Sequence, residues 1–257
     1  MSEDSGRGPA IEVRNLTVSY GPRPALLDVS VSIDHGLLVG VIGPNGAGKS
    51  TLIKAILGLV PRDFGDVVVE GRPAREAAGV VAYVPQRSAV DWDFPVTVRE
   101  VAMMGRYGSI PWWRDPGPDD ERAVDEALAM VRMAELADRQ IGQLSGGQQQ
   151  RVFMARALAQ GGRILLLDEP FAGVDAATER AILDVLHQAR TAGRTLVVVH
   201  HDLVTAAEYF DRLVLIKQRL YAYGPPELVL REDLLSEVYE GRLRIMGSVA
   251  RAAAGGS

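Results

Sequence analysis

The hydrophobic positions change spacing along the chain, from the alternation typical of half-buried strands to the spacing typical of helices. Apolar and polar residues alternate over Ile11–Tyr20 and 27–33, which predicts two early strands. Continuous apolar runs predict buried strands, and helical spacing predicts the helices that follow them. The later predicted strands are 39–43, 66–69, 80–84, 163–167, 195–200 and Arg212–Lys217, and the predicted helices are 49–60, 148–160, Ala176–Thr191 and Leu203–Tyr209.

Residues 88–142 depart from this alternation and are predicted to form an inserted helical lobe. Thr97 and Glu100 have the spacing of a capping box, which predicts that a helix begins there. The stretch 110–120 is rich in Pro, Gly and Trp and predicts a loop. Apolar residues at helical spacing over 123–131 then predict an amphipathic helix.

The α/β pattern resumes after the insert, so the whole chain is interpreted as one domain. This domain spans 10–235, with a core formed by 10–87 and 143–235. Strands that alternate with helices predict a largely parallel sheet with helices on both faces. The small, polar residues 1–9 and 247–257 predict flexible tails.

Composition narrows the classes of function. Hydrophobic residues make up 47% and charged residues 24%, as in an ordinary globular protein. The net charge of -5 argues against nucleic acid as a partner. The absence of cysteine excludes disulfides, thiolate metal sites and cysteine nucleophiles. The first nine residues lack the apolar segment of a signal peptide, and no apolar run is long enough to span a bilayer. If the protein works at a membrane, another polypeptide must cross it.

Residues 43–50 match the G-x-x-x-x-G-K-[ST] phosphate loop. Glycines allow backbone amides to approach phosphates, and the helix that follows directs its positive end at them. Lys49 would contact the β- and γ-phosphates, and the hydroxyl of Ser50 would bind Mg²⁺. The alternative is a glycine-rich turn before a buried helix, which the strand–loop–helix context disfavours.

Two acids, Asp168 and Glu169, end an apolar strand. A buried carboxylate is costly unless it is paired or bound to a metal. Asp168 is interpreted as a Mg²⁺ ligand, acting through water, and Glu169 as the base that deprotonates an attacking water. Acids in an ordinary turn are an equal alternative for this pair alone, and the phosphate loop favours the catalytic interpretation.

The segment Leu144-Ser145-Gly146-Gly147-Gln148 places two glycines at a helix start, as in a phosphate cradle. A plain N-cap by Ser145 is the alternative. With this motif the chain resembles the ATPases of ABC transporters, from about residue 11 to about residue 230. The resemblance implies a P-loop NTPase (RecA-like) core with a parallel sheet, an antiparallel β subdomain and a helical subdomain. It also implies ATP hydrolysis between two copies of the chain, each completing the other's site.

The resemblance assigns further roles residue by residue. Tyr20 would stack on adenine, although a core strand residue is the alternative. Gln86 would sense Mg²⁺ and link to a permease, or it could be a solvated loop residue. His201 would contact the γ-phosphate; His200 should point elsewhere, because adjacent strand residues face opposite ways. The expected catalytic residues are Glu169, His201 and Lys49; the ATP-binding residues are Tyr20, Gly43, Asn45, Gly46, Ala47, Gly48, Lys49, Ser50, Thr51, Gln86, Ser145, Gly146, Gly147, Gln148 and Asp175; and the Mg²⁺ ligands are Ser50, Gln86 and Asp168.

A narrower resemblance covers 83–98, 103–108 and the histidine pair, which are similar to the ATPases of manganese, zinc and iron uptake systems. It implies a homodimer on the cytoplasmic side of the membrane, attached to integral membrane permease subunits. An extracytoplasmic metal-binding protein would act as an indirect partner. Trp92 and Phe94 could anchor a permease helix, or they could pack the inserted lobe on the core.

Two other classes of function share part of this pattern. A soluble ABC ATPase for protein or cluster assembly would share all of the nucleotide motifs. A small-molecule kinase would use the phosphate loop but would have no role for the segment at 144–148, so this class is disfavoured.

Overall fold

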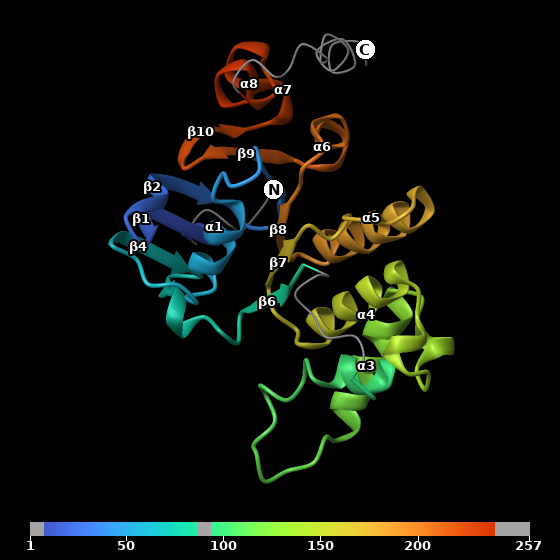
Figure 1. Cartoon of the computed structure of the whole chain (residues 1–257). Helices are drawn as coiled ribbons and strands as arrows, with labels where there is room; N and C mark the ends of the chain where they lie inside the picture. The colour runs from blue at the N-terminus through green and yellow to red at the C-terminus, as the bar shows by residue number, and fades with distance from the viewer. Residues whose placement is uncertain (1–7, 87–93, 240–257) are drawn as a thin grey trace, which may run out of the picture. The chain divides into compact units, whose positions relative to one another are not determined.

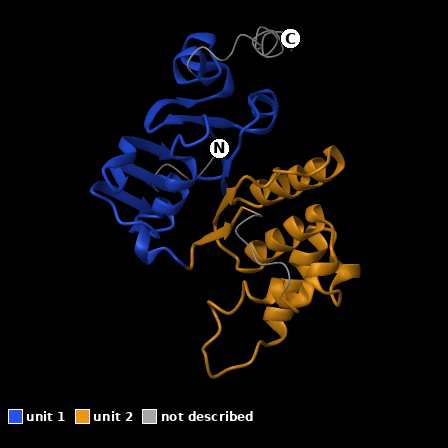
Figure 2. Ribbon diagram, viewed as in Figure 1, with its two compact units in different colours: residues 1–78, 195–257 blue, residues 79–194 orange. Residues whose placement is uncertain are grey.

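The computed structural model describes residues 8–86 and 94–239 (Figure 1). Trp92 lies outside the described residues, and so do most residues of the two predicted tails. The chain divides into two compact units, one of residues 1–78 and 195–257 and the other of residues 79–194 (Figure 2).

The first unit contains an antiparallel sheet. Its strands are β1 (Ile11–Tyr20), β2 (Arg23–Ile33), β4 (Phe64–Val69) and β5 (Arg72–Pro73), in the order β2-β1-β4-β5. β1 pairs with β2 in a register that sets Ile11 opposite Ile33. Buried and less buried residues alternate along much of both strands, as the sequence pattern predicted.

The same unit carries a second group of strands, in the order β10-β9-β3-β8. β3 (Leu38–Ile42) runs parallel to β8 (Thr195–Val199) and to β9 (Arg212–Lys217), and every residue of β3 and β8 is buried. β10 (Arg219–Gly224) pairs antiparallel with β9. The continuous apolar runs therefore form buried parallel strands, as predicted.

Helical segments complete this unit: α1 (Lys49–Ile56), α6 (Leu203–Tyr209), α7 (Pro226–Val229), α8 (Glu232–Val238) and a 3₁₀ turn, η1 (Ala74–Glu76). In Figure 1, α7 and α8 lie together beside β10. The prediction that the first helix extends to residue 60 was wrong. The helix ends at Ile56 because Gly58 adopts φ of 70°, a conformation that stops a helix.

The second unit contains the parallel pair β6 (Val81–Val84) and β7 (Ile164–Asp168). Its helices are α2 (Val98–Met103), α3 (Pro118–Met130), α4 (Gly146–Ala159) and α5 (Ala176–Thr191), with 3₁₀ turns η3 (Ala134–Leu136) and η4 (Ile141–Gln143). The capping box of α2 is confirmed. Thr97 Oγ1 accepts from the Glu100 amide at 3.2 Å, and Glu100 Oε2 accepts from the Thr97 amide at 2.7 Å.

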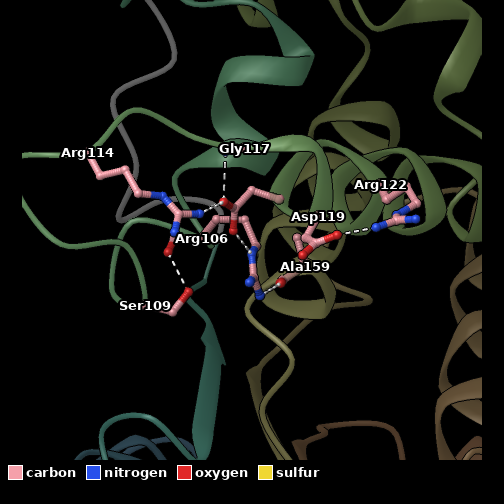
Figure 3. Close-up of polar contacts among 8 residues, drawn as sticks. Arg106, Ser109, Arg114, Gly117, Asp119, Arg122 and Ala159 are labelled. Atoms are coloured by element: carbon pink, nitrogen blue, oxygen red, sulfur yellow. Dashed lines mark hydrogen bonds and ion pairs between the residues drawn. The ribbon is translucent and has the colours of Figure 1, made fainter.

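The loop between α2 and α3 covers residues 104–117, so it begins and ends earlier than the predicted 110–120. α3 already begins at Pro118, whose fixed φ suits the first helical position. Asp120 then accepts the Gly117 amide at 3.0 Å and Nε of Arg106 at 2.9 Å, and Arg106 also reaches the carbonyl of Ala159 at 3.0 Å (Figure 3). The Gly117 amide first, and then Arg106, lower the pKa of Asp120, so this buried carboxylate stays charged. These contacts tie the loop to two helices.

Candidate functional site

The predicted phosphate loop connects β3 to α1 in the first unit. Lys49 is buried, and its Nζ donates to the carbonyls of Gly43 at 2.8 Å and Pro44 at 3.0 Å. Gly43 has φ of 154°, and a Cβ there would lie 2.1 Å from the carbonyl oxygen of Ile216, so no larger residue fits. The loop thus surrounds the ammonium group in front of the first turn of α1. This arrangement concentrates positive potential where a phosphate can bind.

The backbone of the loop is held from the turn between β9 and β10. The Gln218 amide donates to the carbonyl of Ala47 at 2.8 Å, and the Leu27 amide donates to the carbonyl of Gln218 at 2.7 Å. Gln218 itself has φ of 60°, an uncommon value for a residue other than glycine. Three segments that are distant in sequence therefore fix the shape of the loop.

A cavity of about 690 Å³ opens beside the loop. It is lined by Gly43, Pro44, Asn45, Gly46 and Ala47, by His201, and by Lys217, Gln218, Val238 and Tyr239. The loop and His201 were predicted from sequence to act together, and they share this cavity. The last four residues were missed, because they match no motif and reach the loop only through the fold.

The two histidines after β8 have different surroundings. His200 is buried, its Nε2 lies 2.7 Å from Oγ1 of Thr205, and its ring packs near those of Tyr209 and Phe210. Burial lowers the pKa of His200 to about 4, so its ring is neutral at pH 7. His201 is exposed and lines the cavity. The histidine chosen from sequence is therefore the one beside the phosphate loop.

Tyr20, the predicted adenine-stacking residue, ends β1 in the same unit. It is 54% exposed, which excludes the alternative of a buried core residue. Tyr20 is not among the residues that line the cavity.

The predicted carboxylate pair ends β7 in the second unit. All of β7 is buried, including Asp168, and Glu169 follows with φ of 50°. Oε2 of Glu169 accepts a hydrogen bond from Nε2 of Gln86 at 2.9 Å. The structure therefore brings together two site residues that come from separate motifs. Burial first, and the charge of Asp168 second, raise the pKa of Tyr83 to about 12.

The proposed metal ligands are all oxygen donors: the hydroxyl of Ser50, the carboxylate of Asp168 and the amide oxygen of Gln86. Hard oxygen ligands in small number fit Mg²⁺, which keeps water and substrate phosphates in its shell. No group of three or more His, Cys, Asp or Glu side chains suited to a metal occurs among residues 8–86 and 94–239. The chemistry of the three predicted ligands is therefore of the kind that Mg²⁺ prefers.

The segment at 144–148 forms the start of α4. Oγ of Ser145 accepts from the Gln148 amide at 3.3 Å, and Oε1 of Gln148 accepts from the Ser145 amide at 2.9 Å. Ser145 is therefore an N-cap, as the plainer interpretation proposed. The amides of Gly146 and Gly147 lie in the first turn, where helical amides have no intrahelical partner and can bind an anion. The two interpretations are compatible.

Asp175 has a related position at the start of α5. Its carboxylate accepts from the Thr178 amide at 2.8 Å, and this amide is the main cause of a lowered pKa for Asp175. Asp175 is therefore a charged N-cap at neutral pH.

Two further observations concern the described helices and the predicted aromatic anchors. None of the described helices has the length and apolar character needed to cross a bilayer. Phe94 is 60% exposed, whereas Trp92 lies outside the described residues.

Comparison with known proteins places these features in a family. A model of the ABC transporter family matches residues 26–172. The zinc transport system ATP-binding protein TroB of Treponema pallidum is 51% identical over 243 residues, which cover 95% of this chain and 91% of that protein. The manganese transport system ATP-binding protein MntB of Bacillus subtilis is 51% identical over 236 residues, which cover 92% of this chain and 94% of that protein. The chelated iron transport system membrane protein YfeB of Yersinia pestis is 44% identical over 239 residues, which cover 92% of this chain and 81% of that protein.

Solved structures agree on the fold. MJ1267, an ATP-binding cassette of an ABC transporter in its ADP conformation, superposes with a TM-score of 0.80 at 27% identity, covering 91% of this chain and 99% of that one. The predicted α/β fold, a P-loop NTPase with an added antiparallel sheet, is confirmed. The chain belongs to the ABC transporter family, as one of its ATP-binding and ATP-hydrolysing subunits.

Proposed function

We propose that this subunit drives an importer of a divalent metal ion: manganese, zinc or iron. One observation carries the proposal. The chain is 51% identical, over more than nine tenths of its length, to ATP-binding proteins of a zinc and of a manganese transport system. These relatives do not favour a soluble ATPase for protein or cluster assembly. The metal would not touch this subunit, because its selectivity belongs to ligands on partner chains.

The roles of the site residues form part of the proposal. Lys49 and the amides of the phosphate loop bind the β- and γ-phosphates, and His201 contacts the γ-phosphate. Glu169, positioned by its hydrogen bond from Gln86, removes a proton from the attacking water. Mg²⁺, held by Ser50 and Asp168 with Gln86 nearby, would neutralise charge on the phosphate oxygens. Tyr20 stacks on the adenine.

The proposed assembly contains two copies of the chain and the permease. Ser145 to Gln148 and Asp175, at the starts of α4 and α5, complete the site of a second copy across a two-fold axis. Gln86 and the exposed Phe94 lie in the part of the chain that would face the permease. The subunit would then sit at the cytoplasmic side of the membrane. An extracytoplasmic metal-binding protein would deliver the ion, and no nucleic acid would be involved.

The test is the content of manganese, zinc and iron in cells that carry Glu169→Gln in place of the wild-type subunit, grown in metal-poor medium. A matched control is Glu135→Gln, an exposed carboxylate of the same unit. We expect a selective fall in one metal for the first variant and none for the second. Unchanged levels of all three metals, in a strain without another importer, would refute metal import.

A further inference from the structure

The end of α8 contributes to the wall of the phosphate-loop cavity. Tyr239 directly follows the helix, and its backbone amide donates to the carbonyl of Leu235 at 2.9 Å. Val238 and Leu235 are buried, so packing fixes this last turn. Val238 and Tyr239 both line the cavity beside Gly43 to Ala47. A residue almost 200 positions after the loop is thereby brought to its edge.

The hydroxyl of Tyr239 is buried in that position. Its oxygen has no hydrogen bond of normal geometry to any residue in the described parts of the chain. Burial raises the pKa of Tyr239 to about 12, and the backbone amide of Gly43 partly offsets this rise. The Gly43 amide therefore lies near this hydroxyl. The hydroxyl is protonated at neutral pH and keeps a donor hydrogen.

An unsatisfied buried hydroxyl is a cost that phenylalanine would avoid. Leaving a buried polar group without a partner destabilises a protein, whereas an apolar group of the same shape is nearly neutral. A Cβ at Gly43 would lie 2.1 Å from the carbonyl oxygen of Ile216, so position 43 requires glycine. A hydrogen bond from the Gly43 amide would satisfy this hydroxyl and hold the first residue of the loop.

We propose that Tyr239 is a positioning residue for nucleotide binding. Its hydroxyl supports the first residue of the phosphate loop and thereby strengthens the binding of the nucleotide phosphates. The last turn of α8 becomes part of the nucleotide site, which links the C-terminal helix to the bound nucleotide. The proposal rests on the assignment of residues 43–50 as the nucleotide-binding loop.

The test uses Tyr239→Phe in the full chain, which removes only the hydroxyl. We expect the affinity for Mg·ADP to fall roughly 3- to 10-fold, the factor of one neutral hydrogen bond. KM for ATP should rise by a similar factor, with kcat within about two-fold of wild type, because the residue does not touch the reacting atoms. The thermal midpoint should not fall. Hydrogen exchange of the amides at 43–48 should become faster.

Tyr223→Phe is the matched control. Tyr223 lies in β10, its hydroxyl is also buried without a partner among the described residues, and burial raises its pKa. It does not line the cavity. Its variant should keep the wild-type affinity and the wild-type exchange at 43–48.

Three results would overturn the proposal. An unchanged Mg·ADP affinity and unchanged exchange in Tyr239→Phe would exclude support of the loop. An equal loss in Tyr223→Phe would mean that any buried tyrosine hydroxyl has this effect. Lys49→Ala tests the assignment of residues 43–50 as the nucleotide-binding loop. Removing the ammonium group should weaken nucleotide binding much more than Tyr239→Phe does. Wild-type affinity in Lys49→Ala would refute the nucleotide site itself, and with it the role of Tyr239.

Discussion

At the scale of the residue, Glu169 combines an uncommon backbone with a specific partner. Its φ of 50° is rare for a residue other than glycine, and such values cluster at active sites. Gln86 donates to its carboxylate. We expect Glu169→Gln to slow ATP hydrolysis roughly 10²- to 10⁴-fold, because an amide cannot accept the proton of water. ATP binding should persist. The rate of phosphate release measures hydrolysis, and the nucleotide affinity measures binding. Rapid turnover by the variant would exclude Glu169 as the base.

His200 gives a prediction about pH. Its pKa of about 4 in the folded chain lies below the ordinary value of about 6.5, so the unfolded state binds the proton first. Stability is therefore full above pH 6.5 and falls as the pH drops towards 4. When the pH is lowered from 7.5 to 5, the free energy of unfolding therefore falls by about 2 kcal/mol.

We expect His200→Gln to lose about 2 kcal/mol less than wild type over this range, because it has no ring to protonate. Urea unfolding of both proteins at pH 7.5 and 5 measures the difference. The same variant at exposed His187 serves as the control and should behave like wild type. Equal losses in the wild-type protein and in His200→Gln would show that His200 does not set the acid sensitivity.

At the scale of the element, Asp120 holds the loop between α2 and α3. Its carboxylate accepts hydrogen bonds from the Gly117 amide and from Nε of Arg106 (Figure 3). We expect Asp120→Asn to lower the midpoint of thermal unfolding at pH 7, because Arg106 would lose its charged partner. The pKa of Asp120 is lowered, so its contribution is present above the ordinary carboxyl pKa. It is lost as the pH falls through the lowered value.

The neighbouring Asp119 is the control for this element. Its side chain is exposed and pairs with Arg122 one turn further along α3. Exposed pairs contribute little, so Asp119→Asn should leave the midpoint near that of wild type. Calorimetry of both variants at pH 7 and pH 3 checks the prediction. Equal midpoints for the two variants at pH 7 would show that the loop does not need its buried ion pair.

At the scale of the whole molecule, the proposed reaction needs two chains. A nucleotide can favour the closed dimer only through contacts that the open state lacks. We expect Glu169→Gln to be dimeric in Mg·ATP and monomeric in Mg·ADP by sedimentation velocity. Adding Ser145→Arg should abolish the dimer, because the long side chain would obstruct the start of α4. A monomer of Glu169→Gln at saturating Mg·ATP would contradict the two-chain site.

Local rules explain what the sequence determined by itself. The strand β1, the helices α5 and α6 and the capping box of α2 agree with prediction, because spacing and capping act over a few residues. The motifs at 43–50 and at Asp168 and Glu169, at the end of β7, could also be recognised locally, since the chemistry proposed for them requires certain residue types at short spacing. The description of the chain as one domain with an insert over 88–142 stays a prediction.

The tertiary structure decided the contacts between distant segments. No sequence pattern predicted β10, α7 and α8, which are short elements that are stabilised by packing more than by propensity. The bond from Gln86 to Glu169 spans 83 positions, and Tyr239 reaches the loop at Gly43 from the end of α8. No local sequence pattern predicts these contacts, because the pairing of strands and the burial of helices bring the side chains together. The sequence therefore specified the residues of the candidate site, and the fold supplied the neighbours that hold them in place.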